Sequence, residues 1–312
     1  PLMVDKQDKK AEKRAKPASR RLPKTARELK EEVGTTGHSW DGIEELDNPM
    51  PRWWLTVFYI TIIWGVVYTI LYPAWPLVNS ATSGILGWSS RGEFTAEVEA
   101  QNEANAAINA RLDAAELTAI ADDPELEQYA VNAGAAVFRT WCSQCHGAGA
   151  AGAIGFPNLL DDAWLWGGSL EEIYYTVAYG IRNEVSADSH YSEMPAFGDI
   201  LSEEEIAQVV NYVQSLSGDP QDAAAAAAGA EIYLDNWSAC HGEEGLGDIY
   251  QGAPNLTDPI WLYGGDYDTL LETVTYSRYG VMPPWLNTEG GRLTESQVRA
   301  VSVYVHQLGG GQ

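Results

Sequence analysis

Apolar residues form one uninterrupted block in the first quarter of the chain. This block, WWLTVFYITIIWGVVYTILY, covers residues 53–72 and contains no charged residue. At a rise of about 1.5 Å per residue it makes a helix roughly 30 Å long, which matches the hydrocarbon thickness of a bilayer. A buried helix of this length would carry a polar face, and a signal peptide has a shorter apolar run. We therefore predict a transmembrane helix that Pro73 and Pro76 terminate.

The second half of the chain contains one pattern twice. Both copies begin with Asp-Pro, which is typical of a helix N-terminus. Each copy closes with a segment in which apolar residues recur at helical spacing, at 201–218 and 293–310. The alternation of apolar and polar residues that a half-buried strand requires is scarce. We therefore predict an all-α chain that ends in two tandem homologous domains, residues 123–218 and 219–312.

Charge is distributed unevenly on the two sides of the apolar block. Residues 1–30 have a net charge of +7, whereas the remaining 282 residues have a net charge of −32. The basic side of a membrane helix stays in the cytoplasm. We therefore expect a single-pass protein of the bacterial inner membrane, with a cytoplasmic N-terminus and residues 77–312 in the periplasm. At this position the basic segment fits contact with anionic membrane lipids better than nucleic-acid binding.

Three further segments have simpler predictions. Residues 1–34 are basic, have little apolar content and are expected to be a disordered cytoplasmic tail. Residues 35–52 are a juxtamembrane segment. Residues 73–122 are a periplasmic connector that is partly helical, with an Ala- and Glu-rich polar helix within residues 91–120.

The first repeat carries the attachment signature of c-type haem, Cys-x-x-Cys-His, at Cys142, Cys145 and His146. Two cysteines on one helical turn can form thioethers to the two vinyl groups of haem, and the adjacent histidine then reaches the iron. A zinc site would need further Cys or His ligands at suitable spacing, and a redox dithiol needs no adjacent histidine. We predict covalently attached haem c here.

The second repeat keeps Cys240 and His241 but has Trp237 where the first cysteine of the signature belongs. Iron ligation does not need that cysteine, so we favour a second haem c attached by a single thioether. Two alternatives stay open. The domain has lost its haem, or Trp237 is an error in the sequence, since Trp and Cys codons differ by one base. An indole at this position must find room at the haem edge.

A methionine lies at a matching place after each histidine. Met194 is 48 residues after His146, and Met282 is 41 residues after His241. Met/His ligation stabilises ferrous haem and raises its potential. We predict both methionines as axial ligands, by default each within its own repeat, with a crossed arrangement left open. Ordinary core packing is the alternative role for either methionine.

The remaining candidates are one rival ligand and a pair of loop prolines. His190 lies four residues before Met194, but the second repeat has no counterpart, so we assign it to the surface. His38 and His306 receive the same assignment. A backbone carbonyl in the loops of Pro157 and Pro254 could accept a hydrogen bond from the other imidazole nitrogen of the iron ligand. A plain turn is the alternative for both prolines.

Several motifs resemble the dihaem subunit of cbb3-type cytochrome c oxidases. TTGHSWDGIEELDNPMPRWW (35–54) is similar to the juxtamembrane motif of that subunit, and IIWGVVY (62–68) and YPAWP (72–76) follow as in that family. GAAVFRTWCSQCHGAGA (134–150) and GAPNLTDPIWLYGG (252–265) are similar to its two haem domains. The resemblance covers about residues 35–311, and Trp237 is the departure from it.

This resemblance implies a fold and a function. The fold is one transmembrane helix followed by two class I cytochrome c domains. The function is electron transfer from a soluble or membrane-anchored cytochrome c, or from a cytochrome bc complex. Electrons pass through two haems c to a monohaem subunit and then to the haem b and copper subunit that reduces oxygen. The chain is thus expected to be part of an oxidase without carrying the oxygen-reducing site.

Other functions remain as alternatives at this point. The chain could be the cytochrome subunit of another membrane-bound dehydrogenase, although the motif at 35–54 speaks against it. A dihaem peroxidase needs an open iron position, whereas both repeats offer a methionine. A scaffold of degenerate cytochrome domains is suggested by Trp237 and opposed by the complete first site. No Ser/His/Asp constellation, phosphate loop or pair of catalytic carboxylates is recognisable in the sequence.

Overall fold

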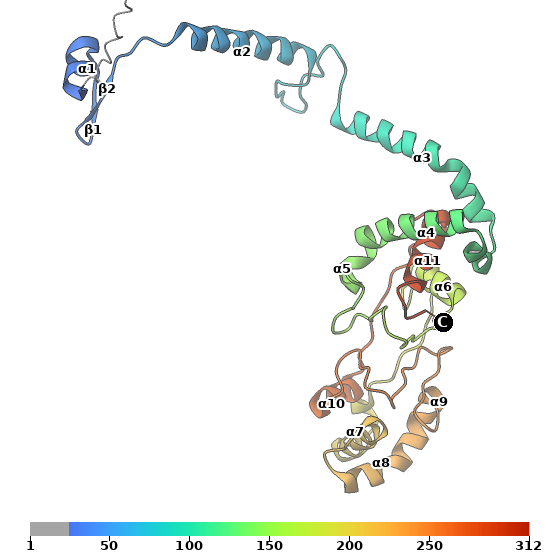
Figure 1. Ribbon diagram of the computed structural model, residues 1–312. Helices are drawn as coiled ribbons and strands as arrows, with labels where there is room; N and C mark the ends of the chain where they lie inside the picture. The colour runs from blue at the N-terminus through green and yellow to red at the C-terminus, as the bar shows by residue number, and fades with distance from the viewer. Residues whose placement is uncertain (1–24, 312) are drawn as a thin grey trace, which may run out of the picture. The chain divides into compact units, whose positions relative to one another are not determined.

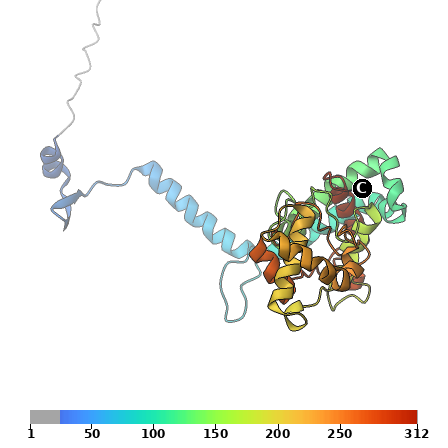
Figure 2. The ribbon, with the colours of Figure 1, turned by 90° about the horizontal axis from the view of Figure 1, so that it is seen from below.

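The computed structural model describes residues 25–311 (Figures 1 and 2). It consists of two units, and the boundary between them in the sequence follows residue 97. Residues 1–24 of the predicted tail therefore lie outside the described residues, and residues 25–34 lie within them. The elements of the first unit are α1 (Ala26–Val33), β1 (Thr35–Trp40), β2 (Ile43–Leu46), α2 (Arg52–Leu71) and the start of α3 (Ser90–Ala114). The elements of the second unit are η1 (Leu117–Asp122), α4 (Pro124–Val137), η2 (Phe138–Cys142), α5 (Ser143–His146), α6 (Leu170–Tyr179), η3 (Phe197–Asp199), α7 (Glu203–Ser217), α8 (Ala223–Asn236), α9 (Ser238–His241), α10 (Tyr267–Tyr276), η4 (Asn287–Glu289) and α11 (Glu295–His306).

Residues 25–34, the described part of the tail predicted to be disordered over residues 1–34, contain a helix. Helix α1 begins behind Thr25, whose hydroxyl accepts a hydrogen bond from the Glu28 amide at 3.3 Å, while the Glu28 carboxylate accepts from the Thr25 amide at 2.8 Å. Reciprocal bonds of this kind stabilise a helix N-terminus. Strands β1 and β2 then form an antiparallel hairpin. Its turn has positive φ at Asp41 and Gly42, as a type I′ turn requires.

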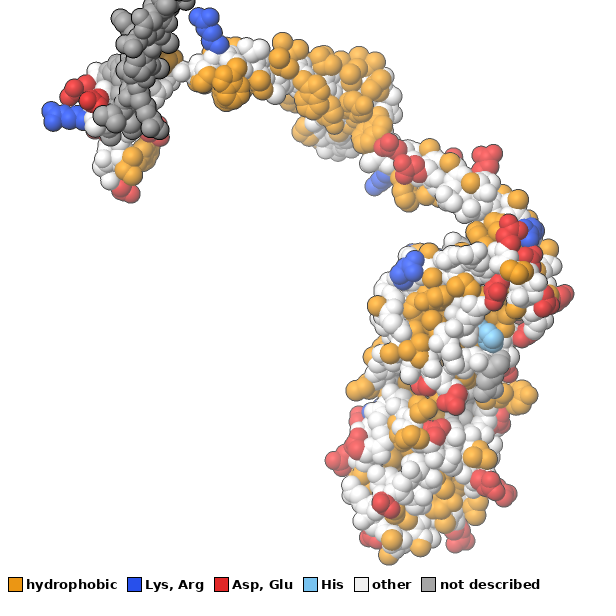
Figure 3. All heavy atoms as spheres, in the orientation of Figure 1, with side chains coloured by type: hydrophobic (Ala, Val, Ile, Leu, Met, Phe, Trp, Pro, Cys, Tyr) orange, Lys and Arg blue, Asp and Glu red, His pale blue; other side chains and the backbone are white. Residues whose placement is uncertain are grey.

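Helix α2 is the predicted transmembrane helix, with each end one residue earlier than expected. It is an unbroken helix of 20 residues, and none of these residues is buried. Figure 3 shows hydrophobic side chains over its visible surface. Among residues 25–311 it is the one helix long and apolar enough to cross a membrane. An apolar surface of this size is stable in lipid and not in water.

The predicted connector contains α3 and η1, and charged side chains fix the point where it meets the first repeat. Asp123 caps α4, because its carboxylate accepts hydrogen bonds from the amides of Glu125 and Leu126 at 3.2 Å. Arg111 on α3 pairs with Asp123 and with Glu125, at 2.7 Å in each case. The Asp-Pro pair thus marks a helix start, as the sequence predicts.

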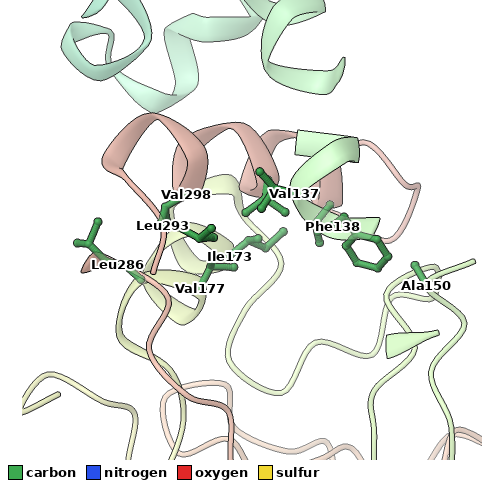
Figure 4. Packing of buried hydrophobic residues seen from close by; sticks show 11 residues of the cluster. Val137, Phe138, Ala150, Ile173, Val177, Leu286, Leu293 and Val298 are labelled. Carbon is green, nitrogen blue, oxygen red and sulfur yellow. The ribbon is translucent and has the colours of Figure 1, made fainter. Parts of the chain in front are cut away.

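The second unit has two main hydrophobic cores, and each combines helices of both repeats. One core, shown in Figure 4, brings α11 of the second repeat against α4 and α6 of the first. The other core brings α7 of the first repeat against α8 and α10 of the second. The predicted apolar positions of α7 are buried in this second core; they are Ile206, Val209, Val210 and Val213.

Two glycines allow these helices to cross closely. A Cβ on Gly134 of α4 would lie 2.1 Å from the carbonyl oxygen of Ala300 on α11. A Cβ on Gly229 of α8 would lie 2.1 Å from the carbonyl oxygen of Gln208 on α7. These glycines are equivalent in the two repeats, each twelve residues before its histidine. The same helix crossing therefore occurs twice, and each time its two helices come from different repeats.

This exchange affects the domain boundary predicted between residues 218 and 219. The sequence repeats end there, but in the structure the boundary lies within one core, because α7 and α8 on its two sides pack together. Only residues 218–222 join these helices. So short a connection favours antiparallel neighbours. Each of the two cores therefore takes helices from both repeats, and residues 98–312 form one compact unit.

Candidate functional site

The Cys-x-x-Cys-His segment of the first repeat lies at the mouth of an apolar cavity. Helix α4 passes into the π-helical turn η2, which ends at Cys142, and α5 then carries Cys145 and His146. π-Helical turns are frequent at functional sites. All three of these side chains line a cavity of about 480 Å³. Its other walls are mostly aromatic and aliphatic, and they include Phe138, Trp141, Trp164, Trp166, Val301 and Val305.

His146 is held in one tautomer. Its Nδ1 lies 3.1 Å from the carbonyl oxygen of Pro157. A carbonyl only accepts, so Nδ1 carries the hydrogen and Nε2 keeps its lone pair. Burial lowers the pKa of His146, while the bond to Pro157 acts in the opposite direction. The hydrogen bond expected from the loop of Pro157 is confirmed, and it prepares the imidazole as a neutral ligand.

The methionine in this cavity is Met282, from the other repeat. Its main chain pairs with that of Ile181, just after α6, through hydrogen bonds of 2.9 and 3.0 Å. The Asn183 amide donates a further bond to the Met282 carbonyl at 3.3 Å. The structure therefore differs from the default expectation that each methionine lies with the histidine of its own repeat.

The second cavity shows the same exchange. His241 and Cys240 line it together with Met194. The Nδ1 of His241 lies 3.0 Å from the Pro254 carbonyl oxygen, and burial lowers the pKa of this histidine also. Ser277, at the C-terminal end of α10, donates its hydroxyl hydrogen to the Met194 carbonyl at 2.6 Å. The second proline loop thus repeats the geometry of the first, and a first-repeat methionine faces the second-repeat histidine.

Trp237 makes the second cavity smaller than the first. Its side chain is 3 % exposed, and its ring stacks on Phe197 with centroids 3.8 Å apart. The cavity measures about 200 Å³, whereas pockets for cofactor-sized ligands usually measure about 300–1,000 Å³. The Cys240 thiol lies 3.3 Å from the side-chain oxygen of Gln251. The first cavity therefore fits a haem in size and lining, and the second fits in its donor groups but requires the Trp237–Phe197 pair to move.

The two cavities share a wall made by both repeats. The amide of Gly155 donates a hydrogen bond to the Leu262 carbonyl at 2.8 Å. A Cβ on Gly252 would lie 2.3 Å from the indole of Trp166, so this ring packs directly on the second-repeat loop. The residues that line both cavities are Leu165, Arg182, Leu262, Tyr263, Tyr279 and Gly280.

Sequence reasoning missed two polar groups at this wall. The Trp166 indole is 7 % exposed, and its Nε1 has no hydrogen-bond partner among the described residues. Arg182 lines both cavities. The second repeat has Tyr263 in place of Trp166, so the comparison of repeats that revealed the other candidates gave no signal for these two.

The assignment of His190 to the surface is wrong. The side chain is half-buried, its ring stacks on Trp166 with centroids 4.3 Å apart, and Nε2 lies 3.2 Å from the Thr176 hydroxyl. Its main chain bonds to Gly180 and Arg182. His190 is not among the residues that line the cavity. It therefore supports the wall of the first cavity from behind, because the segment that leads to Met194 folds back onto α6.

Comparison with known protein families gives three matches along the chain. Residues 32–79 match the family described as the N-terminal domain of cytochrome oxidase-cbb3, FixP. Residues 130–213 match cytochrome c oxidase, cbb3-type, subunit III. Residues 226–309 match the cytochrome c family. These matches agree with the resemblance seen in the motifs of the apolar helix and the two repeats.

Several full-length relatives are similar to the chain. The cbb3-type cytochrome c oxidase subunit CcoP of Cereibacter sphaeroides is 60% identical over 283 residues, which is 90% of this chain and 96% of the relative. CcoP of Rhodobacter capsulatus is 54% identical and covers 91% of this chain and 98% of its own length. Subunit FixP of Azorhizobium caulinodans is 51% identical, with coverage of 89% and 94%. The chain therefore belongs to the CcoP/FixP family, the electron-transfer subunits of cbb3-type cytochrome c oxidases.

Proposed function

We propose that this chain carries electrons through two haems c, one in each cavity, toward the oxygen-reducing subunit of its oxidase. The observation that carries this proposal is that each cavity joins a Cys-His segment to a methionine. When bound, haem c supplies a one-electron Fe(III)/Fe(II) couple. The protein residues hold it, keep water away from it and set its potential.

In the first cavity Cys142 and Cys145 would hold the haem through two thioethers, and His146 and Met282 would bind its iron. The neutral imidazole, fixed by the Pro157 carbonyl, supports this role. The soft thioether of Met282 favours the ferrous state and raises the potential. A high potential suits a carrier that accepts electrons from a cytochrome.

In the second cavity His241 and Met194 would bind the iron, and Cys240 would provide the single thioether. The Pro254 carbonyl positions this histidine as the Pro157 carbonyl does in the first cavity, and the Ser277 hydroxyl holds the methionine segment. A haem in this cavity would require the Trp237–Phe197 pair to give up its stacked arrangement. The second cavity keeps His241, its bond to Pro254 and a methionine although one cysteine is missing, which favours a second haem that takes part in electron transfer.

The single helix α2 anchors the chain in the inner membrane with the N-terminus in the cytoplasm and the cavities in the periplasm. The uneven charge of the two sides supports this orientation. The partners are membrane lipids around α2, the catalytic haem b and copper subunit, and the monohaem cytochrome c subunit. Nucleic acid is not a partner in this proposal.

The donor is a basic cytochrome c or a cytochrome bc complex. Residues 31–312 have a net charge of −32, and Figure 3 shows acidic side chains distributed over the visible face of the second unit. Such a surface attracts a cationic partner and increases its association rate. We expect the association rate with a basic cytochrome c to fall as salt is added. A rate that is constant in salt would argue against this donor.

Intact mass of the denatured chain tests the haem content, with the absorbance of the native chain measured first. Thioether-bound haem survives denaturation. The proposal predicts a mass increment of two haems. An increment of one haem with two haems by absorbance would contradict the single thioether at Cys240. One haem by both methods would contradict the second redox centre.

A further inference from the structure

Arg182 is the only ionic side chain in the wall shared by the two cavities. It follows α6, where its backbone has a φ of +50°. The other five shared residues are uncharged. A charge at this place is close to both sites at once, so its effect on one site cannot be separated from its effect on the other.

The guanidinium is held in place by main-chain groups and aromatic rings. Its Nε donates to the Ser192 carbonyl at 2.5 Å, and Nη1 donates to the Gly280 carbonyl at 3.1 Å. Its central carbon lies 5.9 Å from the ring centre of Trp166 and 5.8 Å from that of Tyr279. Ser192 and Gly280 belong to different repeats, so Arg182 ties the two methionine segments together.

No carboxylate within residues 25–311 forms an ion pair with Arg182. Within the second unit, Arg111, Arg278 and Arg299 all have acidic partners. Two further arginines, Arg139 and Arg292, lack such a pair in the described region, but both are exposed to solvent. Arg182 is partly buried, and burial lowers its pKa, while the charge of Glu193 acts in the opposite direction without forming an ion pair. Buried charges in proteins are normally paired.

We propose that Arg182 is a shared counter-charge for the carboxylates of the haems in both cavities, and that it raises the potential of both. This inference rests on the proposed function, since it requires both haems. Haem carries two propionate groups, and a guanidinium with free donors is a preferred partner for carboxylates. The unpartnered Nε1 donor of Trp166, on the first cavity, offers a second hydrogen bond to the same kind of acceptor.

The direction of the effect follows from electrostatics. A cation near the iron disfavours the ferric state, which is more positive than the ferrous state. Removal of the charge therefore lowers both potentials. We take an intermediate distance between the guanidinium and the iron, and an effective dielectric constant between that of water and that of a dry protein interior. Loss of the charge then changes the Fe(III)/Fe(II) equilibrium constant about tenfold, which is about 59 mV for one electron.

The test is spectroelectrochemical titration of the full chain, after the haem content of each variant has been measured by absorbance. Arg182→Gln is expected to lower the potential of both haems by about 59 mV, which corresponds to a tenfold change in each Fe(III)/Fe(II) equilibrium constant. Arg182→Lys keeps the charge and is expected to restore both. Arg139→Gln removes an exposed charge close to the first site and is expected to change neither.

Three results would overturn the proposal. These are potentials unchanged in Arg182→Gln, a change in one haem alone, and an Arg182→Lys variant that shifts like Arg182→Gln. A wild-type chain with one haem contradicts the proposed function itself, and that result is read from absorbance before any titration. If Arg182→Gln does not fold, the Arg182→His variant tests the same charge effect through the pH dependence of the potentials. Both potentials must then fall, relative to wild type, as the pH rises through the histidine pKa, and unchanged values overturn the proposal.

Discussion

Ser277 donates a hydrogen bond to the carbonyl of Met194, although 83 residues separate them. The bond joins the end of α10 in the second repeat to the methionine segment of the first. Just after α6, the main chain of Ile181 pairs with that of Met282. Each helix end thus holds the methionine segment of the other repeat, and this exchange is the basis of the proposed ligand pairs.

Replacement of Ser277 is expected to weaken ligation by Met194 and leave Met282 unaffected. Ser277→Gly removes the hydroxyl and tolerates the φ of +59° at this position. Loss of a hydrogen bond of about 1 kcal/mol makes displacement of the methionine roughly fivefold easier. Imidazole titration of the ferric chain measures this displacement for each haem. Ser215→Ala, which removes a hydroxyl bonded only within α7, is the matched control. An equal change at both haems would contradict the assignment.

The crossing of α4 and α11 is expected to be intolerant of a methyl group. Gly134→Ala places a Cβ against the Ala300 carbonyl, and overpacking of this kind reduces the free energy of unfolding by about 1–3 kcal/mol. Gly229→Ala is expected to do the same at the other crossing. Gly92→Ala on α3 meets only a serine hydroxyl and should be close to neutral. Denaturant unfolding followed by circular dichroism gives the comparison, and a neutral Gly134→Ala would contradict this packing.

The cap of α4 is expected to make stability depend on pH. Hydrogen bonds from the Leu126 amide and from Arg111 hold the pKa of Asp123 below its usual value of 3.8. A depressed pKa in the folded state gives stability that is present above the unfolded pKa and is lost as the pH falls through the folded pKa. The decrease in Tm caused by Asp123→Ala should therefore be largest at neutral pH and shrink below about pH 4. Asp122→Ala is the control, and a decrease that is independent of pH would be inconsistent with the cap.

Trp237→Cys is expected to complete the attachment site of the second haem. The substitution removes the ring stacked on Phe197 and supplies a thiol where the first repeat has Cys142. The cavity becomes larger, and a second thioether becomes available. We expect a larger fraction of chains with two haems after denaturation, measured by mass and haemochrome absorbance. Trp237→Ala enlarges the cavity without adding a thiol, so it separates the effect of cavity size from the effect of a second thioether. An unchanged fraction in Trp237→Cys would show that Trp237 does not limit attachment.

Local features of the fold and site were predictable from the sequence because they depend on neighbouring residues. The apolar length of α2, the Asp-Pro helix start and the Cys-x-x-Cys-His segment are all of this kind. Comparison of the repeats also identified the proline loops, which hold His146 and His241 as expected. The small hairpin of β1 and β2 and the helix α1 were not foreseen, since turn geometry and capping at Thr25 decide them.

The exchange of helices between repeats was not predicted from the sequence, which left open only a crossed pairing of the methionines. Helices α7 and α11 have similar apolar patterns, and Gly134 or Gly229 could accept either of them. The short connection from α7 to α8 is the signal that favours the observed pairing, because it allows little besides direct contact. Neither Arg182 nor Trp166 is repeated as the same residue type in the second repeat, so their place beside the cavities follows only from the packing of the chain.

The most direct test of the account is the identity of the methionine that ligates the first haem. His241→Ala with Cys240→Ser leaves haem in the first cavity only, and either methionine is then changed to leucine. Optical spectra of the ferric chain report methionine ligation through its weak long-wavelength absorption band. If the methionines are exchanged between the repeats, Met282→Leu abolishes this band and Met194→Leu leaves it intact. Loss of the band in Met194→Leu with retention in Met282→Leu would contradict the exchange between the repeats.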